Sequence, residues 1–190
     1  MSLFAMFSSG REDAPERPVI RIPIIVWALA ATLPAHATTL RRASLDDLIQ
    51  TSTSIVRGRV AASSTTSQGP LAYTHYTVQV LDRWKGAVAG QVDVQVPQGD
   101  GAPQFAAGSE YVFFLWTGPS GANHVLGLSQ GALDIAKDAK GNTLVVRQPT
   151  EAMVLDQATG DTSSQDPIRM KLSDFASRVS STLGRSSIAK

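Results

Sequence analysis

The segment Gly127-Leu-Ser129-Gln-Gly131 matches the G-x-S-x-G pattern in which hydrolases hold a nucleophilic serine. That chemistry needs a strand-to-helix turn, a histidine base and an acid that orients the histidine. The residues from Ala132 to Ala136 instead predict another strand, and His75 and His124 both precede Ser129, whereas the hydrolase order places the histidine last. We therefore interpret the motif as a glycine-bounded turn between strands. A serine hydrolase that uses Ser129 is the less favoured alternative.

No metal or cofactor site is predicted. Neither His75 nor His124 has a second His, Asp or Glu at the three- to five-residue spacing of metal ligands. The acidic stretch from Asp134 to Asn142 lacks the spacing of a calcium loop and predicts a hairpin. The chain has no cysteine, which excludes disulfides, Cys-ligated zinc and a thiol nucleophile. Because no acid, base and nucleophile can be assembled, we expect a protein that is not an enzyme.

Aromatic side chains could stack on a ligand, but most of them occupy alternating or apolar positions that are typical of a core. These are Tyr73, Tyr76, Tyr111, Phe113, Phe114 and Trp116. Trp84 differs, because it stands at the end of a predicted strand between Arg83 and Lys85. We expect its indole to be half exposed and select it as a candidate contact for a partner.

The charge balance argues against nucleic acid as a partner. The 190 residues include 17 Lys and Arg and 16 Asp and Glu, for a formal net charge of +1. Nucleic acids and anionic membranes select clustered basic residues, and the longest basic run is Arg41-Arg42. The length and the 43% hydrophobic content suit one globular domain.

The N-terminal region predicts export. Ile22 to Leu33 is an almost continuous apolar run that follows Arg17 and Arg21 and ends in Pro34-Ala-His-Ala37. A basic flank, an apolar run and a small-x-small site are typical of a signal peptide, here residues 1–37. The run is too short to cross a bilayer comfortably, so we expect no membrane anchor after cleavage. The product would be periplasmic or extracellular.

The first residues do not fit that pattern, because a positive flank should lack Glu12, Asp13 and Glu16. We hypothesise that residues 1–18 reflect a mis-assigned start and that translation begins at Val19. A peptide from residues 1–18 in the native host would contradict this.

Residues 38–150 predict a β domain that begins with a short helix. The helix spans Ser44 to Gln50, with Ser44 as N-cap and acidic residues in its first turn. Tyr111 to Trp116 is apolar on both faces, which predicts a central strand. Ser63 to Ala72 predicts a polar loop. Alternating patterns predict about seven short strands in all, over Ser54–Ala62, Tyr76–Gly86, Gln91–Val96, Tyr111–Trp116, His124–Leu128, Ala132–Ile135 and Thr143–Arg147.

The C-terminal part predicts a flexible linker and a helix. Residues 151–167 include a polar stretch with almost nothing to bury, which is typical of a linker. Residues 168–184 predict an amphipathic helix with Ser173 as its cap, and with apolar residues at a spacing of four along one face. We expect this helix to pack on the β domain rather than on a membrane.

Three segments in order resemble the netrin-like modules, which include the tissue inhibitors of metalloproteinases. They are Leu48-Ile-Gln-Thr-Ser-Thr-Ser-Ile-Val-Arg-Gly-Arg-Val60, Tyr76-Thr-Val-Gln-Val-Leu-Asp-Arg-Trp-Lys-Gly86 and Phe105-Ala-Ala-Gly-Ser-Glu-Tyr-Val112. The resemblance covers roughly residues 44–116 and implies a small OB-like barrel of five strands with flanking helices. The chain also resembles a group of uncharacterised bacterial exported proteins with the same layout.

The resemblance also implies a way of binding. In the inhibitors a mature N-terminal cysteine chelates the zinc of a protease through its amine and carbonyl groups. Here Thr38-Thr39 would occupy that position, and the framework cysteines are missing. We therefore expect an exported, non-enzymatic module that docks on or inhibits another extracytoplasmic protein, such as a metalloprotease. Thr38, Thr39 and Trp84 are its candidate binding residues, and a carbohydrate-binding module that uses Trp84 is the alternative.

Overall fold

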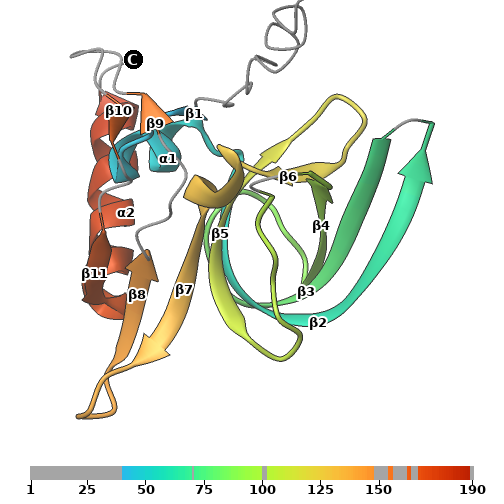
Figure 1. The fold of residues 1–190 in the computed structure, drawn as a ribbon. Coiled ribbons are helices and arrows are strands. Elements are labelled where there is room, and N and C mark those ends of the chain that lie inside the picture. The colour runs from blue at the N-terminus through green and yellow to red at the C-terminus, as the bar shows by residue number, and fades with distance from the viewer. Residues whose placement is uncertain are drawn as a thin grey trace, which may run out of the picture. The chain divides into compact units, whose positions relative to one another are not determined.

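The computed structural model describes residues 40–69, 71–99, 102–147, 154–155, 162–163 and 167–188 (Figure 1). Contacts divide the chain between Ala37 and Thr38, and all described residues belong to the second part. The predicted signal peptide, residues 1–37, lies outside the described residues. In the described part, no helix combines the length and hydrophobicity that crossing a membrane requires.

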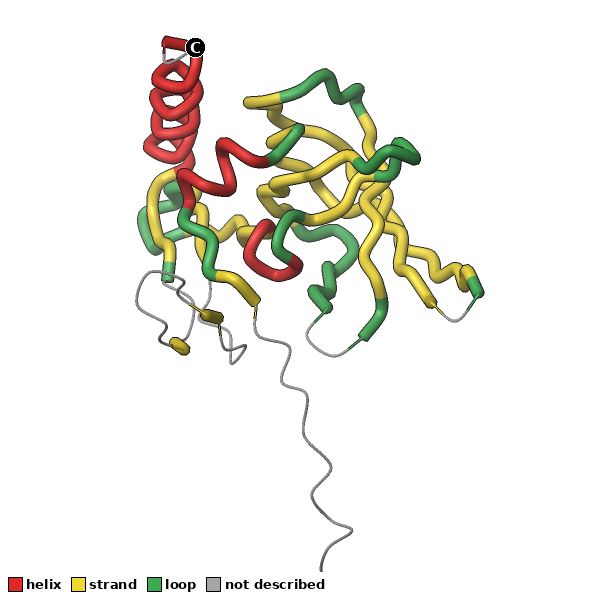
Figure 2. Tube along the Cα trace, turned by 90° about the horizontal axis from the view of Figure 1, so that it is seen from above, coloured by secondary structure: helices red, strands yellow, loops and turns green. Residues whose placement is uncertain are grey.

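Five strands pair in a closed ring, in the order β2-β3-β4-β6-β5 and back to β2 (Figures 1 and 2). The β4–β6 pair is parallel and the other four pairs are antiparallel. The strands are β2 (Ser54–Gln68), β3 (Leu71–Lys85), β4 (Gln91–Pro97), β5 (Glu110–Thr117) and β6 (Asn123–Val125). The fold is therefore mainly β, as the sequence predicts.

Three more strands extend this sheet from β5 in the order β7-β8-β11, and three short ones form a separate small sheet. The extension comprises β7 (Ala132–Lys137), β8 (Thr143–Arg147) and β11 (Ile168–Lys171), and the small sheet comprises β1 (Leu40–Arg41), β9 (Val154–Leu155) and β10 (Thr162–Ser163). Because β11 pairs with β8, the β structure continues beyond residue 150, where the predicted domain ends.

Both helices, α1 (Leu45–Thr51) and α2 (Leu172–Ile188), lie on one side of the ring, beside β7 and β8 (Figure 2). The start of α1 follows its prediction, since Ser44 and Asp47 form a capping box. Helix α2 begins later than predicted, because residues 168–171 are strand β11. Their side chains alternate between half-buried and exposed, which is the period of a strand. Ser173 lies inside the helix rather than capping it, and the helix ends at Ile188 rather than at residue 184.

Strand β5 separates two hydrophobic cores. Phe113 and Leu115 face the interior of the ring, and Val112 and Phe114 face the opposite side. The ring core also contains the alternating valines of β4 and β3, and the outer core contains Leu48, Ile49, Phe175 and Val179 of the two helices. The predicted central strand is thus confirmed.

Several predicted boundaries were wrong. The predicted loop from Ser63 to Ala72 is a hairpin arm, because β2 continues to Gln68 and turns through Gly69, whose φ is 61°. Side chains 61–67 are exposed, so the arm lacks the hydrophobic alternation that reveals a strand. The strand predicted over His124–Leu128 ends at Val125. Of the predicted linker, residues 154–155 and 162–163 form strands, residue 167 has no regular structure and the remainder lies outside the described residues.

Gly58 gives a test of the close contact between β2 and β3. A Cβ atom there would lie 2.8 Å from the Gln79 carbonyl oxygen and still closer to Val78 Cγ1. Gly58→Ala should lower the free energy of unfolding by about 1–3 kcal/mol, because the added methyl overpacks the ring. Urea denaturation measures this. Gly90→Ala is the matched control, since its Cβ would meet nothing. Equal stability of the two variants would contradict the packing described.

Candidate functional site

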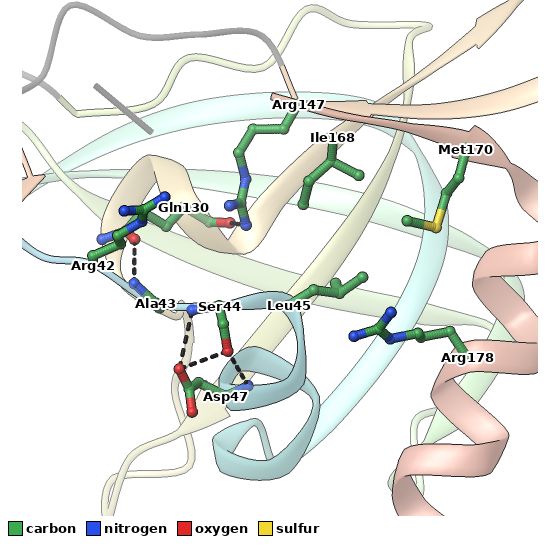
Figure 3. A pocket seen from close by; sticks show the side chains of 10 residues that line it. All are labelled: Arg42, Ala43, Ser44, Leu45, Asp47, Gln130, Arg147, Ile168, Met170 and Arg178. Carbon is green, nitrogen blue, oxygen red and sulfur yellow. Dashed lines mark hydrogen bonds between the residues drawn. The ribbon is translucent and has the colours of Figure 1, made fainter. Parts of the chain in front are cut away.

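A pocket of about 490 Å³ lies among α1, α2, β8, β11 and the 3-10 helix η2 (Leu128–Gly131) (Figure 3). Three arginines, the acidic residue Asp47 and several apolar side chains line it. The basic residues are Arg42, Arg147 and Arg178, and the apolar ones include Leu45, Ile168 and Met170.

Gln130 fixes one wall of the pocket. Its side chain is almost fully buried, and its Oε1 atom accepts a hydrogen bond of 2.8 Å from the Ala43 backbone N–H. Arg147 donates from Nη2 to the Gln130 backbone carbonyl over 2.9 Å. One residue of η2 thereby joins the segment that enters α1 to the end of β8.

The glycines of the G-x-S-x-G segment serve this turn. Gly127 has a φ of 61°, in the left-handed region that favours glycine. A Cβ atom on Gly131 would collide with the Leu126 carbonyl oxygen. Leu128, which lies between Gly127 and Ser129, also has a positive φ of 55°. The turn between β6 and β7 therefore explains both glycines of the motif by backbone geometry.

Ser129 itself lies within η2, a short turn that leads into strand β7. No hydrogen bond joins Ser129 to either His75 or His124 in the described structure, and each histidine has other neighbours. The His75 ring contacts Asp93 Oδ2 and Thr66 Oγ1, each over 2.9 Å. The interpretation of the motif as a turn accounts for its geometry.

Arg178 reaches the pocket from α2 and is held by α1. It donates to both oxygens of Asp46, over 3.1 and 2.9 Å, and Thr182 Oγ1 donates to Asp46 Oδ1 over 3.1 Å. The Arg178 hydrogen bonds lower the pKa of Asp46, with Thr182 contributing and partial burial opposing. Asp46 therefore stays ionised and ties the two helices together beside the pocket.

Of the sequence-predicted binding residues, only Trp84 is described by the structure, and it does not line this pocket. Thr38 and Thr39 lie outside the described residues. Trp84 is partly buried, and its ring packs edge-to-face on Phe175 of α2 with centroids 5.1 Å apart. It thus contributes to holding the helix on the sheet.

Trp116, which we expected in the core, is 43% exposed. It stacks near His124 at a tilt of 33°, with ring centroids 6.0 Å apart. The signal in the sequence is its position, since Trp116 ends the apolar run directly before Thr117-Gly118. A residue at the end of a two-sided strand can pass beyond the elements that cover its neighbours.

The pocket offers chemistry for binding. Guanidinium groups recognise carboxylates through paired, charge-assisted hydrogen bonds, and the apolar side chains suit an aliphatic or aromatic neighbour of that carboxylate. Among the described residues, no three His, Cys, Asp or Glu side chains cluster so that they could hold a metal ion. The residues missed by sequence reasoning, above all Gln130 and Arg147, come from separate segments that only the fold brings together.

Gln130→Leu should lower the free energy of unfolding by about 1–3 kcal/mol, because the Ala43 N–H loses its acceptor in a partly buried place. Urea denaturation of the chain measures this. Ser129→Ala, the neighbouring substitution, should stay within about 0.5 kcal/mol of the parent. A Gln130→Leu variant as stable as the parent would show that η2 does not anchor this segment.

The Asp46–Arg178 pair should make stability depend on pH. Because folding lowers the pKa of Asp46, the contribution is present above its unfolded value of about 3.9 and is lost as pH falls through the folded value. A double-mutant cycle of Asp46→Asn and Arg178→Gln should give a coupling below about 1 kcal/mol at pH 7, since the pair is partly exposed. The coupling should vanish near pH 2. Equal coupling at both values would contradict the ionised pair.

Comparison with protein-family models, curated proteins and solved structures gives no match to any of them. The functional argument for this chain therefore rests on the geometry of its own residues.

Proposed function

We propose that the chain is an exported, non-enzymatic module that binds another extracytoplasmic protein at the pocket beside its N-terminal segment. One observation carries this proposal: Arg42, Arg147 and several apolar side chains meet in a pocket among strands and helices. Arg178 also lines the pocket and is paired with Asp46, and Asp47 is the acidic residue of the lining. Such a pocket suits an acidic side chain or a terminal carboxylate of a partner protein, with an adjoining apolar residue.

We further infer that the ring of five strands is an OB-type barrel. Its order of pairing and its single parallel pair, β4–β6, support this, as does the Greek-key course of the chain. The resemblance to netrin-like modules points to the same architecture. OB-type barrels host many unrelated functions, so this inference alone selects no ligand.

Two features of the sequence support export, and the terminus that export would create indicates a class of partner. The apolar run from Ile22 to Leu33 and the small-x-small site before Thr38 favour cleavage of residues 1–37. Cleavage there would give Thr38 a free amine, four residues before Arg42 of the pocket. An amine and carbonyl at such a terminus can chelate zinc, which makes a metalloprotease the first class of partner to test.

Charge reversal at the pocket tests the proposal. Three forms of the chain would be compared in its native host, each tagged after Lys190: the parent, Arg42→Glu and Arg169→Glu. Each form would be cross-linked to neighbouring proteins and purified through its tag. Arg42→Glu should reduce recovery of the partner about tenfold or more, because the new carboxylate would repel the acidic group of the partner. Arg169 is exposed on β11 and does not line the pocket, so its reversal should leave recovery unchanged.

Recovery of one extracytoplasmic protein with the parent and with Arg169→Glu, but not with Arg42→Glu, would support the proposal. Equal recovery with all three chains, or recovery of no protein with any of them, would contradict it.

A further inference from the structure

A row of side chains crosses the outer face of the ring. His75 of β3 lies opposite Gln95 of β4 in the strand register. Gln95 in turn lies opposite His124 of β6, and His124 lies opposite Trp116 of β5. The preceding or following residues of these strands, including Val94 and Val125, face the core inside the ring. Strands β3, β4, β6 and β5 are neighbours in the ring (Figure 1). The row therefore lies on their face away from that core.

One end of the row is aromatic. The Trp116 indole is 43% exposed and lies beside the His124 ring. Gly118 follows closely, and a Cβ atom there would come within 3.2 Å of the indole. The absence of a side chain at Gly118 thus leaves this indole room on one side.

The middle of the row contains polar atoms without protein partners. Gln95 is only 8% exposed, yet its amide makes no hydrogen bond within the described part of the chain. The His124 ring nitrogens also lack a hydrogen-bond partner among the described residues. The amide atoms of Gln95 are not among the buried side-chain atoms that lack a partner, so the amide reaches the surface of the row. It can there donate to and accept from a polar ligand.

The far end of the row is held in position. His75 contacts Asp93 Oδ2 through Nδ1 and Thr66 Oγ1 through Nε2. An ionised carboxylate only accepts, so Nδ1–H donates to Asp93 and the Thr66 hydroxyl donates to Nε2 when the ring is neutral. Asp93 Oδ1 makes no hydrogen bond among the described atoms, so an acceptor is left at this end.

We propose that this row, defined as Trp116, His124, Gln95, His75 and Asp93, binds a neutral saccharide. The C–H face of a pyranose ring carries partial positive charge and stacks on the negative face of an indole. Its hydroxyl groups both donate and accept, which matches an amide, an imidazole and a carboxylate. This function goes beyond the proposed protein docking, because it uses a different surface and a different class of ligand.

Other ligand classes fit this surface less well. The row contains no Lys or Arg, and it includes Asp93, so phosphate groups and acidic sugars find no cation there. An extended peptide would need free backbone groups at a sheet edge. At Gln95, strand β4 is already paired with β3 on one side and β6 on the other.

Titration of the full chain with cellohexaose tests the proposal, because its glucose units have equatorial substituents and flat C–H faces. Calorimetry and the indole N–H signals in two-dimensional NMR would be recorded up to about 10 mM sugar, since a single stacking site with few hydrogen bonds gives millimolar affinity. We expect saturable binding with a shift of the Trp116 indole signal, which is assigned by its loss in Trp116→Ala.

Trp116→Ala should weaken this binding about tenfold or more, and Trp116→Phe should restore part of it. Trp84→Phe is the matched control, because Trp84 packs beneath α2 and should leave affinity unchanged. The remaining amide signals of each variant confirm that the fold is kept.

Three results would overturn the proposal: no saturable change with cellohexaose, a change that survives Trp116→Ala, or binding of a sulfated heparin hexasaccharide without binding of cellohexaose. Retention of the protein partner by Trp116→Ala would show that the two surfaces act separately.

Discussion

Strand β5 is the constraint on which the structure depends, because it must be buried on both faces. Phe113 and Leu115 complete the core inside the ring, and Val112 and Phe114 complete the core beneath the helices. Each buried side chain of this size contributes about 1.5–3 kcal/mol, so neither half can detach without exposing a row of them. The ring and the helical side are therefore one cooperative unit built on a shared strand.

That arrangement also explains where the two surfaces of interest arise. On the helical side, Gln130 accepts a hydrogen bond from Ala43 and Asp46 accepts hydrogen bonds from Arg178. The pocket lined by Arg42, Arg147 and Arg178 lies beside these contacts. The row proposed to bind a saccharide lies on strands of the ring, and its exposed aromatic member, Trp116, lies near the end of β5. Both surfaces thus depend on elements that the same two cores keep rigid.

The sequence predicts those parts of the fold that bury a periodic face. The two-sided run of β5 as far as Leu115, the alternating valines of β4 and the N-cap Ser44 of α1 all carry local signals, and all are confirmed. The hairpin arm of β2 and β3 is exposed along its tip and carries no such signal. The sequence predicts the start of a helix at strand β11, because only the pairing of β11 with β8 distinguishes a strand from a helix there. The pocket combines residues from segments far apart in the sequence, such as Arg42 and Arg178, which no local pattern can bring together.

The proposal that the free amine of Thr38, four residues before Arg42 of the pocket, takes part in binding a protein is tested most directly by capture. Residues 38–190 would be immobilised through Lys190, either with the Thr38 amine free or with one added residue before it, and exposed to extracytoplasmic proteins of the host. We predict that a zinc protease is retained by the first form and lost with the second, because the added residue removes the amine from its position. Retention of the same proteins by both forms would contradict a role of the Thr38 amine, and retention of none by either would contradict the proposed binding of a protein.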